Sequence, residues 1–166
     1  MSHDGKAVAN VVLEICWAAD RPVTNLAVQK IVYFCHVWSL IDLQRPLIRH
    51  AFEAWRHGPV LPYLYHEFKE FGERPIRRKA YRIDLKTGER IVAMDLFDQP
   101  AQDVIERVTN FYGRLPARTL VDMTHVENGP WHQVWNHDGF SNPGMNIRDE
   151  DIVKFYSRSH HLQRMQ

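Results

Sequence analysis

One stretch of the chain decides the fold, TNLAVQKIVYFCHVW at residues 24–38. Thr24 suits a helix N-cap, because its hydroxyl can accept a hydrogen bond from a free N–H of the first turn. Residues 31–38 are apolar nearly all round, and a helix without a polar face is buried. We therefore expect a helix from Asn25 to about Leu43 at the centre of the domain, ended by Arg45-Pro46.

The residues before this stretch predict a first, amphipathic helix from about Lys6 to Ala19, ended by Asp20-Arg21-Pro22. Its apolar side chains recur at the spacing of one buried helix face. They are Val8, Val11, Val12, Ile15 and Ala19.

After the central helix the pattern changes to extended chain. Residues 47–56 favour an extended segment, His57-Gly58-Pro59 indicates a turn, and a third helix is expected from about Leu61 to Phe71. Within residues 76–94, apolar and polar residues alternate on both sides of a turn at residues 86–89. This alternation predicts a β-hairpin.

The rest of the chain predicts further helices. One follows Asp98-Gln99-Pro100, another runs from Pro116 to about Val126, a short turn of helix starts at Pro130, and the last runs from about Asp149 to His160. A loop is expected at residues 141–144. The apolar face of the helix after Asp98 is expected to hold Val104, Ile105, Val108, Phe111 and Tyr112. The fold class is therefore mainly α (α+β), a single compact domain of about six helices with a small β-sheet or hairpin.

The composition is that of an ordinary globular protein, with 45% hydrophobic and 25% charged residues. The 21 basic and 20 acidic side chains leave a formal net charge of +1, which argues against a protein whose whole surface coats nucleic acid or acidic lipid. We expect no secretory signal, no membrane span and a cytoplasmic protein. Cys16 and Cys35 lie in apolar helical stretches, so we expect them to be buried free thiols.

No pattern of residues indicates catalysis. The glycines are scattered singly without the spacing of a phosphate-binding loop, and there is no GxSxG nucleophile motif. His132 and His137 are five residues apart and do not share a helix face, and Glu67 with Glu70 is expected to be solvated helix surface. We therefore expect no catalytic residue, no metal and no cofactor.

Two groups of residues are candidates for binding a partner. The segment 74–82 carries Arg and Lys without any acid, which suits a phosphate or an acidic protein surface, although a solvated loop is the alternative. Tryptophan and arginine are enriched at binding hot spots, although the tryptophans also suit core or loop-anchoring roles. The candidate partner-binding residues are Trp55, Arg56, His57, Arg77, Arg78, Trp131 and Trp135.

Three blocks of sequence, in this order, resemble the Panacea domain, the SocA-like antitoxin family that also contains phage-associated proteins. They are residues 9–13 with 24–38, residues 46–47 with 52–60 and 65–69, and residues 124–125 with 130–135. The match spans about residues 7–157 and implies a single Panacea-type domain across residues 1–166. Its motif or structural positions are Thr24, Asn25, Gln29, Lys30, Tyr33, Gly58, Pro59, Tyr65, His125 and Pro130.

The resemblance implies a mostly helical antitoxin of bacterial or phage origin that neutralises a cognate protein toxin by direct binding. Such an antitoxin blocks its toxin sterically or acts as an adaptor that hands the toxin to a AAA+ protease such as ClpXP. Two other classes stay open. One is a phage or host regulator that binds nucleic acid through residues 74–82, and the other, a residual reading, is a hydrolase that uses its histidines.

Overall fold

The computed structural model describes the backbone of residues 1–135 and 145–163, with side chains as far as residue 158. These residues form seven α-helices and five short strands, which confirms the expected mainly α, α+β fold. The loop expected at residues 141–144 and the side chain of His137 lie outside the described residues.

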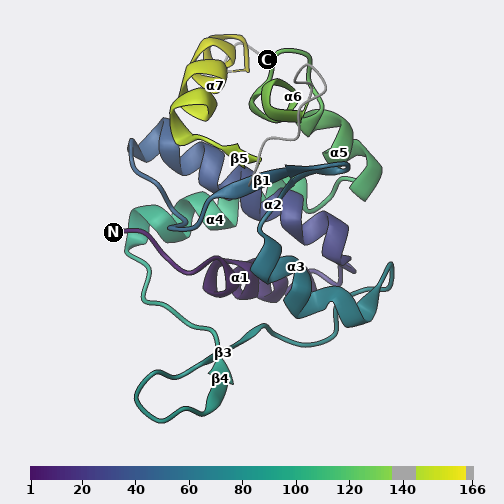
Figure 1. Cartoon of the computed structure of the whole chain (residues 1–166), viewed down its shortest axis with the longest axis vertical. Helices are drawn as coiled ribbons and strands as arrows, with labels where there is room; N and C mark the ends of the chain where they lie inside the picture. The colour runs from purple at the N-terminus through teal and green to yellow at the C-terminus, as the bar shows by residue number, and fades with distance from the viewer. Residues whose placement is uncertain (136–144, 164–166) are drawn as a thin grey trace.

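Helix α2, Asn25–Trp38, is the centre of the molecule (Figure 1). The Thr24 hydroxyl accepts a hydrogen bond from the Ala27 N–H, so the predicted N-cap is confirmed. Every residue from Val28 to Trp38 is buried. The helix continues as a π-turn, Ser39–Leu43, and ends where Gln44 takes a left-handed conformation.

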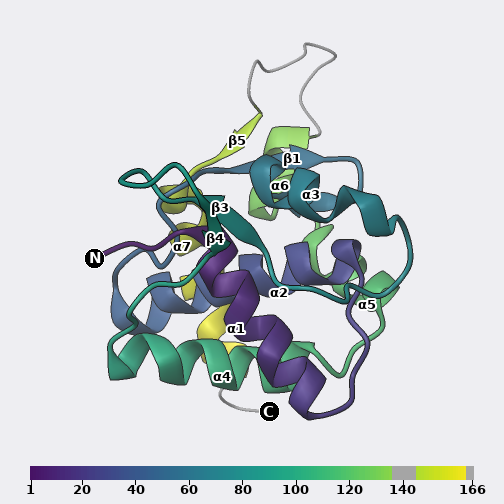
Figure 2. The ribbon, with the colours of Figure 1, turned by 90° about the horizontal axis from the view of Figure 1, so that it is seen from below.

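Two helices pack along α2. Helix α1, Gly5–Ala18, is capped by Asp4, and helix α4, Gln99–Tyr112, is capped by Asp98, each through a carboxylate that accepts from a first-turn N–H. The three helices contact one another and run close together in Figure 2. Within this packing Cys16 and Cys35 are buried free thiols, as expected.

A three-stranded antiparallel sheet crosses one side of α2. Its order is β2-β1-β5, formed by Gly58–Val60, Phe52–Trp55 and Asn146–Ile147. Strands β1 and β2 are joined by the tight turn at Arg56-His57, because Trp55 pairs with Gly58. Helix α3, Pro62–Phe68, and a 3₁₀ turn, Lys69–Phe71, follow directly.

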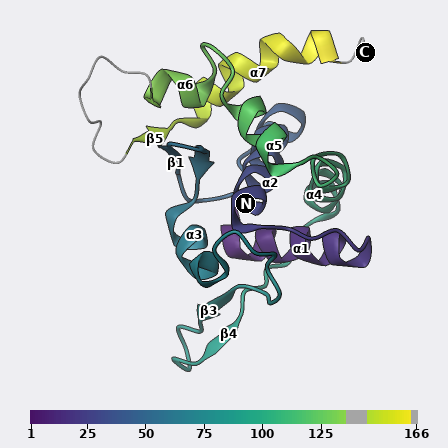
Figure 3. The same ribbon diagram turned by 90° about the vertical axis from the view of Figure 1, so that its right-hand side faces the viewer.

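The expected hairpin is formed by β3, Tyr81–Ile83, and β4, Arg90–Val92. Its strands are shorter than the alternating segment from which it was predicted. The hairpin projects from the end of the molecule that is opposite α7, Asp149–Gln163, as Figures 1 and 3 both show.

Helices α5, Ala117–Thr124, and α6, Pro130–Trp135, lead towards α7 and close the other end of the core. His36 on α2 ties this end together. Its Nδ1 accepts a hydrogen bond from the Ile48 N–H at 3.1 Å, so its Nε2 carries the proton that is donated to Asp149 Oδ1 at 2.8 Å.

One expectation about the buried helix faces needs correction. Phe111 was placed on the buried face of α4, but its side chain is 60% exposed, because the neighbouring Tyr112 takes the inward position and stacks on Phe34. No membrane span is expected from the sequence, and the segment Asn25–Leu43 passes the test for one by length and composition only. About 72% of it is buried inside the fold, which is the packing of a core helix.

Candidate partner-binding surface

A row of polar side chains on α2 faces α3 and the start of the sheet. Asn25 Nδ2 donates to the Tyr65 carbonyl at 3.1 Å, and Gln29 Nε2 donates to Asn25 Oδ1 at 3.0 Å. Gln29 Oε1 in turn accepts from the Leu61 N–H at 3.1 Å. Buried amides need such partners, and the bonds to Tyr65 and Leu61 also fix the start of α3 and its cap on α2.

Lys30 is completely buried beside this row. Its Nζ donates to the Pro59 carbonyl at 3.0 Å, and burial lowers its pKa to about 7. Gly58 is at φ +107°, and a Cβ there would lie 2.6 Å from Thr124 Oγ1 and 2.7 Å from Lys30 Cε. Only glycine fits at this point, where the β1–β2 turn lies between α2 and α5.

Trp131 connects α6 to the same turn. It is buried, and its indole N–H donates to the Trp55 carbonyl at 2.7 Å. Its ring stacks on His125, with centroids 3.7 Å apart, and on Trp135 at 5.8 Å. We call the close packing of Lys30, Gly58, Thr124 and Trp131, together with His125, the motif junction.

The motif junction favours the neutral form of His125. Burial lowers its pKa, and the nearby charge of Lys30 lowers it further. Its Nε2 is buried and has no hydrogen-bond partner among the described residues. The imidazole stacks its flat face on Trp131, which agrees with a structural role.

The partner-binding candidates around this junction differ in exposure. The side chains of Arg56 and His57 are exposed at the tip of the turn, and Trp135 is 39% exposed. Trp55 is half-buried, with its indole N–H on Glu53 Oε2 and its ring edge on Tyr65. Trp131 is an internal anchor, so the surface that the turn presents consists mainly of Arg56, His57 and Trp135.

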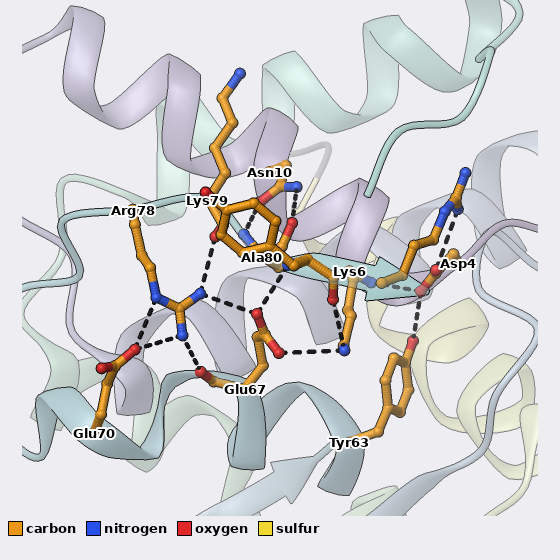
Figure 4. A network of polar contacts seen from close by, with 11 residues as sticks. Asp4, Lys6, Asn10, Tyr63, Glu67, Glu70, Arg78, Lys79 and Ala80 are labelled. Carbon is orange, nitrogen blue, oxygen red and sulfur yellow. Dashed lines mark hydrogen bonds and ion pairs between the residues drawn. The ribbon is translucent and has the colours of Figure 1, made fainter. Parts of the chain in front are cut away.

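The basic segment 74–82 has fewer unpaired charges than its sequence indicates. Arg78 forms ion pairs with Glu67 at 2.9 Å and Glu70 at 2.5 Å, and Arg82 pairs with Asp95 at 2.9 Å and with Asp4 at 3.2 Å. These acids come from other parts of the chain, which is why the segment alone does not reveal them. Of the two predicted contact residues here, Arg77 is exposed and Arg78 is part of the internal network (Figure 4).

Glu67 was expected to lie on a solvated helix face, and that expectation is wrong. Only 14% of its side chain is exposed, and Figure 4 shows it between Arg78 and Lys6. Burial alone would raise its pKa, but the Tyr81 N–H, Arg78 and Lys6 together hold the pKa below its ordinary value. Glu67 is thus an ionised internal carboxylate.

Asn10 and Lys6 of α1 hold the base of the hairpin. Asn10 Nδ2 donates to the carbonyls of Ala80 and Ala93, and its Oδ1 accepts from the Ala80 N–H at 2.7 Å. Lys6 Nζ donates to the Tyr81 carbonyl at 2.8 Å. We call Lys6, Asn10 and Glu67 the hairpin clamp.

Sequence reasoning missed the hairpin clamp. A detectable signal was the position of Asn10 among the apolar residues of its helix, because a polar residue there needs a buried partner. For Lys6 and Glu67 no local signal existed, since both side chains have the spacing of ordinary exposed charges.

The comparisons with known proteins agree with this arrangement of motifs. The family model described as "Antitoxin SocA-like, Panacea domain" matches residues 28–132. The chain belongs to this family. Among curated proteins it is similar to "Antitoxin SocA" of Caulobacter vibrioides (strain NA1000 / CB15N), with 40% identity over 152 residues that cover 92% of this chain and 80% of the relative. No solved structure matches the chain.

The residues matched by the Panacea family model run from α2 to α6 and include the whole motif junction. The predicted resemblance is therefore confirmed. In the parts of the chain that the structure describes, no group of three or more His, Cys, Asp or Glu side chains is arranged to hold a metal ion.

Proposed function

We propose that this protein is the antitoxin of a type II toxin–antitoxin system and neutralises a cognate protein toxin by direct binding. The observation that carries the proposal is the 40% identity to a protein named an antitoxin, extending over 92% of the chain. The relative's name does not identify a toxin, so the partner is defined here as the product of the adjacent gene.

The turn at Arg56-His57 and the neighbouring Trp135 are the proposed contact with the toxin. Their side chains are exposed, whereas the backbone below them is fixed by Lys30, Gly58 and Trp131. A surface that is already ordered loses little conformational entropy on binding, which favours affinity. The proposed role is therefore that of a rigid binding platform, without catalysis and without a cofactor.

The finer mode of neutralisation is also a proposal. We infer that the protein works in the cytoplasm and that residues 1–166 act as one unit, either by steric block or as an adaptor to a AAA+ protease such as ClpXP. An adaptor needs two separate surfaces, one for the toxin and one for the protease.

Co-expression with the product of the adjacent gene tests the main proposal. We expect that product to be toxic alone, and to be bound and neutralised when this protein is present. A harmless neighbour, or one that stays lethal and unbound, contradicts the proposal. For the contact surface, the double variant Arg56→Ala/His57→Ala should weaken binding by about tenfold or more, while Arg114→Ala, an exposed arginine on another part of the surface, should not.

The adaptor mode has its own measurement. Purified ClpXP should degrade the toxin faster when this protein is added, and an unchanged rate together with full neutralisation indicates steric block.

Nucleic-acid binding is the less favoured alternative, because Arg78 and Arg82 are already paired with carboxylates. A mobility-shift assay at two salt concentrations separates it, since phosphate contacts weaken steeply as salt rises.

A further inference from the structure

The two faces of the β3–β4 hairpin have different environments. Ala80 and Ala93 lie on the inner face and are buried against Asn10. Because side chains alternate along a strand and Tyr81 pairs with Val92, the outer face consists of Tyr81, Ile83, Arg90 and Val92. Ile83 is 57% exposed.

Exposed large apolar side chains are concentrated around this hairpin. Of the nine in the described residues, four lie between positions 83 and 96, namely Ile83, Leu85, Met94 and Leu96. Single exposed apolar residues are ordinary, but a cluster of them marks an interaction surface. A two-stranded hairpin is marginally stable alone, so the hairpin clamp is what keeps this cluster in place.

The two edges of the hairpin also differ. The Ala93 N–H donates to the Ala80 carbonyl, so Ala80 and Ala93 are a hydrogen-bonded pair. Hydrogen-bonded pairs alternate with non-hydrogen-bonded pairs along an antiparallel ladder. The N–H and carbonyl groups of the next pair, Tyr81 with Val92, and of every second pair after it therefore point away from the partner strand. On the β3 edge, the N–H and carbonyl of Tyr81 are already bound by Glu67 and Lys6. On the β4 edge, the N–H and carbonyl groups of Arg90 and Val92 face outward, and the sheet has no further strand among the described residues. The β4 edge is the open one.

Arg90 is a positive charge on the outer face that has no ion pair among the described residues. Its guanidinium lies 4.2 Å from the centroid of the Tyr81 ring. Strand alternation places the two nearby acids, Asp84 and Glu89, on the opposite face. Arg82, on the inner face, is by contrast paired with Asp4 and Asp95.

We propose that the open edge of β4 and the outer face beside it bind an extended segment of the toxin, with apolar side chains and a carboxylate opposite Arg90. This inference rests on the proposed function, because the occupant is the toxin. Strand addition supplies backbone hydrogen bonds, and the alternate side chains supply specificity. A second copy of this chain fits less well, because symmetric pairing of two β4 edges brings two Arg90 side chains close together.

The hairpin and the turn at Arg56-His57 lie at different places on the molecule (Figures 1 and 3). They therefore contact different parts of one toxin. Two separate contacts on the same partner strengthen each other, because the second forms within the complex.

Amide hydrogen exchange of the full chain, alone and with the product of the adjacent gene, tests the edge directly. We expect the N–H groups of Arg90 and Val92 to exchange at least about tenfold more slowly in the complex, while the Ile83 N–H on the β3 edge changes little. If the complex forms and these two amides do not change, this inference is wrong and the proposed function stands. If no complex forms, this inference and the proposed function are both wrong.

Two sets of variants test the same contact through affinity. Val92→Pro removes an outward N–H that the hairpin ladder does not use, and should weaken binding by about tenfold or more. Val92→Thr keeps the N–H and the branched shape, so its loss should be far smaller. Arg90→Glu should weaken binding by about tenfold and Arg90→Lys by much less, with Arg114→Glu as the matched charge reversal that leaves affinity unchanged.

The remaining outcomes are also decisive. If Val92→Pro and Arg90→Glu keep the circular dichroism spectrum of the parent and bind the toxin equally well, the β4 edge is not the contact. If the amides of Arg90 and Val92 are already protected in the chain alone, in proportion to its concentration, a second copy occupies the edge and the toxin does not.

Discussion

The motif junction and the hairpin clamp hold two surfaces in place by different means. At the junction, Gly58 is confined by Thr124 and Lys30 at distances that leave no room for a methyl group. At the hairpin, Asn10 and Lys6 hold only the base through hydrogen bonds, and the outer part of the hairpin is exposed. One region is stabilised by close packing and the other by paired polar groups.

This difference has a consequence for how each region tolerates change. Close packing depends on shape, so a single added methyl group at the junction is costly. A polar clamp depends on matched donors and acceptors, so it fails when one member is removed and the others are left unpaired. Four predictions test this distinction, and they follow in order of expected effect.

Gly58→Ala should have the largest effect. The alanine must adopt a positive φ and its Cβ must displace Thr124 and Lys30, so we expect a loss of about 3 to 4 kcal/mol in the free energy of unfolding by urea denaturation. Gly88→Ala at the hairpin tip is the matched control. Gly88 also has a positive φ, but nothing lies within 4 Å of its Cβ position, so the loss should be about 1 kcal/mol. Equal losses for the two variants would contradict the packing argument.

Asn10→Ala should remove the centre of the hairpin clamp. It leaves the Ala93 carbonyl and the Ala80 N–H without a partner and removes one of the two hydrogen bonds to the Ala80 carbonyl, at a cost of about 2 to 3 kcal/mol. Exchange of the β3 and β4 amides should accelerate more than that of α2. Glu106→Ala, at an exposed position of α4, should change stability by less than about 0.5 kcal/mol.

Trp131→Phe should weaken the junction by about 2 kcal/mol, because it removes the bond to the Trp55 carbonyl and part of a buried ring. Thermal unfolding measures the change. Trp135→Phe is the control, because it changes an exposed ring that lacks this hydrogen bond. A loss of stability as large as that of Trp131→Phe would show that the hydrogen bond is unimportant.

The smallest effect is the contribution of Lys30 to pH dependence. Its pKa is about 7 in the folded chain and 10.5 ordinarily, so between these values the unfolded chain binds a proton that the folded chain has released. Stability should therefore rise from pH 7.5 to 8.5, by at most about 1.4 kcal/mol per pH unit.

Urea denaturation of Lys30→Met across the same pH range is the corresponding measurement. In this variant the rise in stability from pH 7.5 to 8.5 should disappear, whatever its absolute stability. His125 does not interfere, because its pKa is lowered from 6.5 and it is neutral throughout this range. The range stops below pH 9 because burial raises the pKa of Cys35 to about 12, which makes stability fall at higher pH. If the stability of Lys30→Met still rises with pH as steeply as that of the parent, Lys30 is not the source of the pH dependence.

Much of the fold could be predicted because its signals are local. The N-cap at Thr24 and the end of α1 near Asp20 depend on neighbouring residues. The apolar periodicity of α1 and α2 shows which helix faces are buried. The candidate contact at Arg56-His57 could also be predicted from local sequence, because a turn before Gly58 exposes the residues at its tip. Phe111 was misplaced because periodicity alone does not choose between two adjacent aromatic residues at the edge of an apolar face.

The sequence by itself determined the order of the helices, the central place of α2 and the membership of the Panacea family. Only the tertiary structure decided which charged and polar groups are internal. Asn10 and Ala80 are 70 residues apart, and Arg78, in the segment before β3, reaches Glu67 on α3. Such pairs depend on how elements pack, because a side chain is buried or exposed only relative to distant parts of the chain.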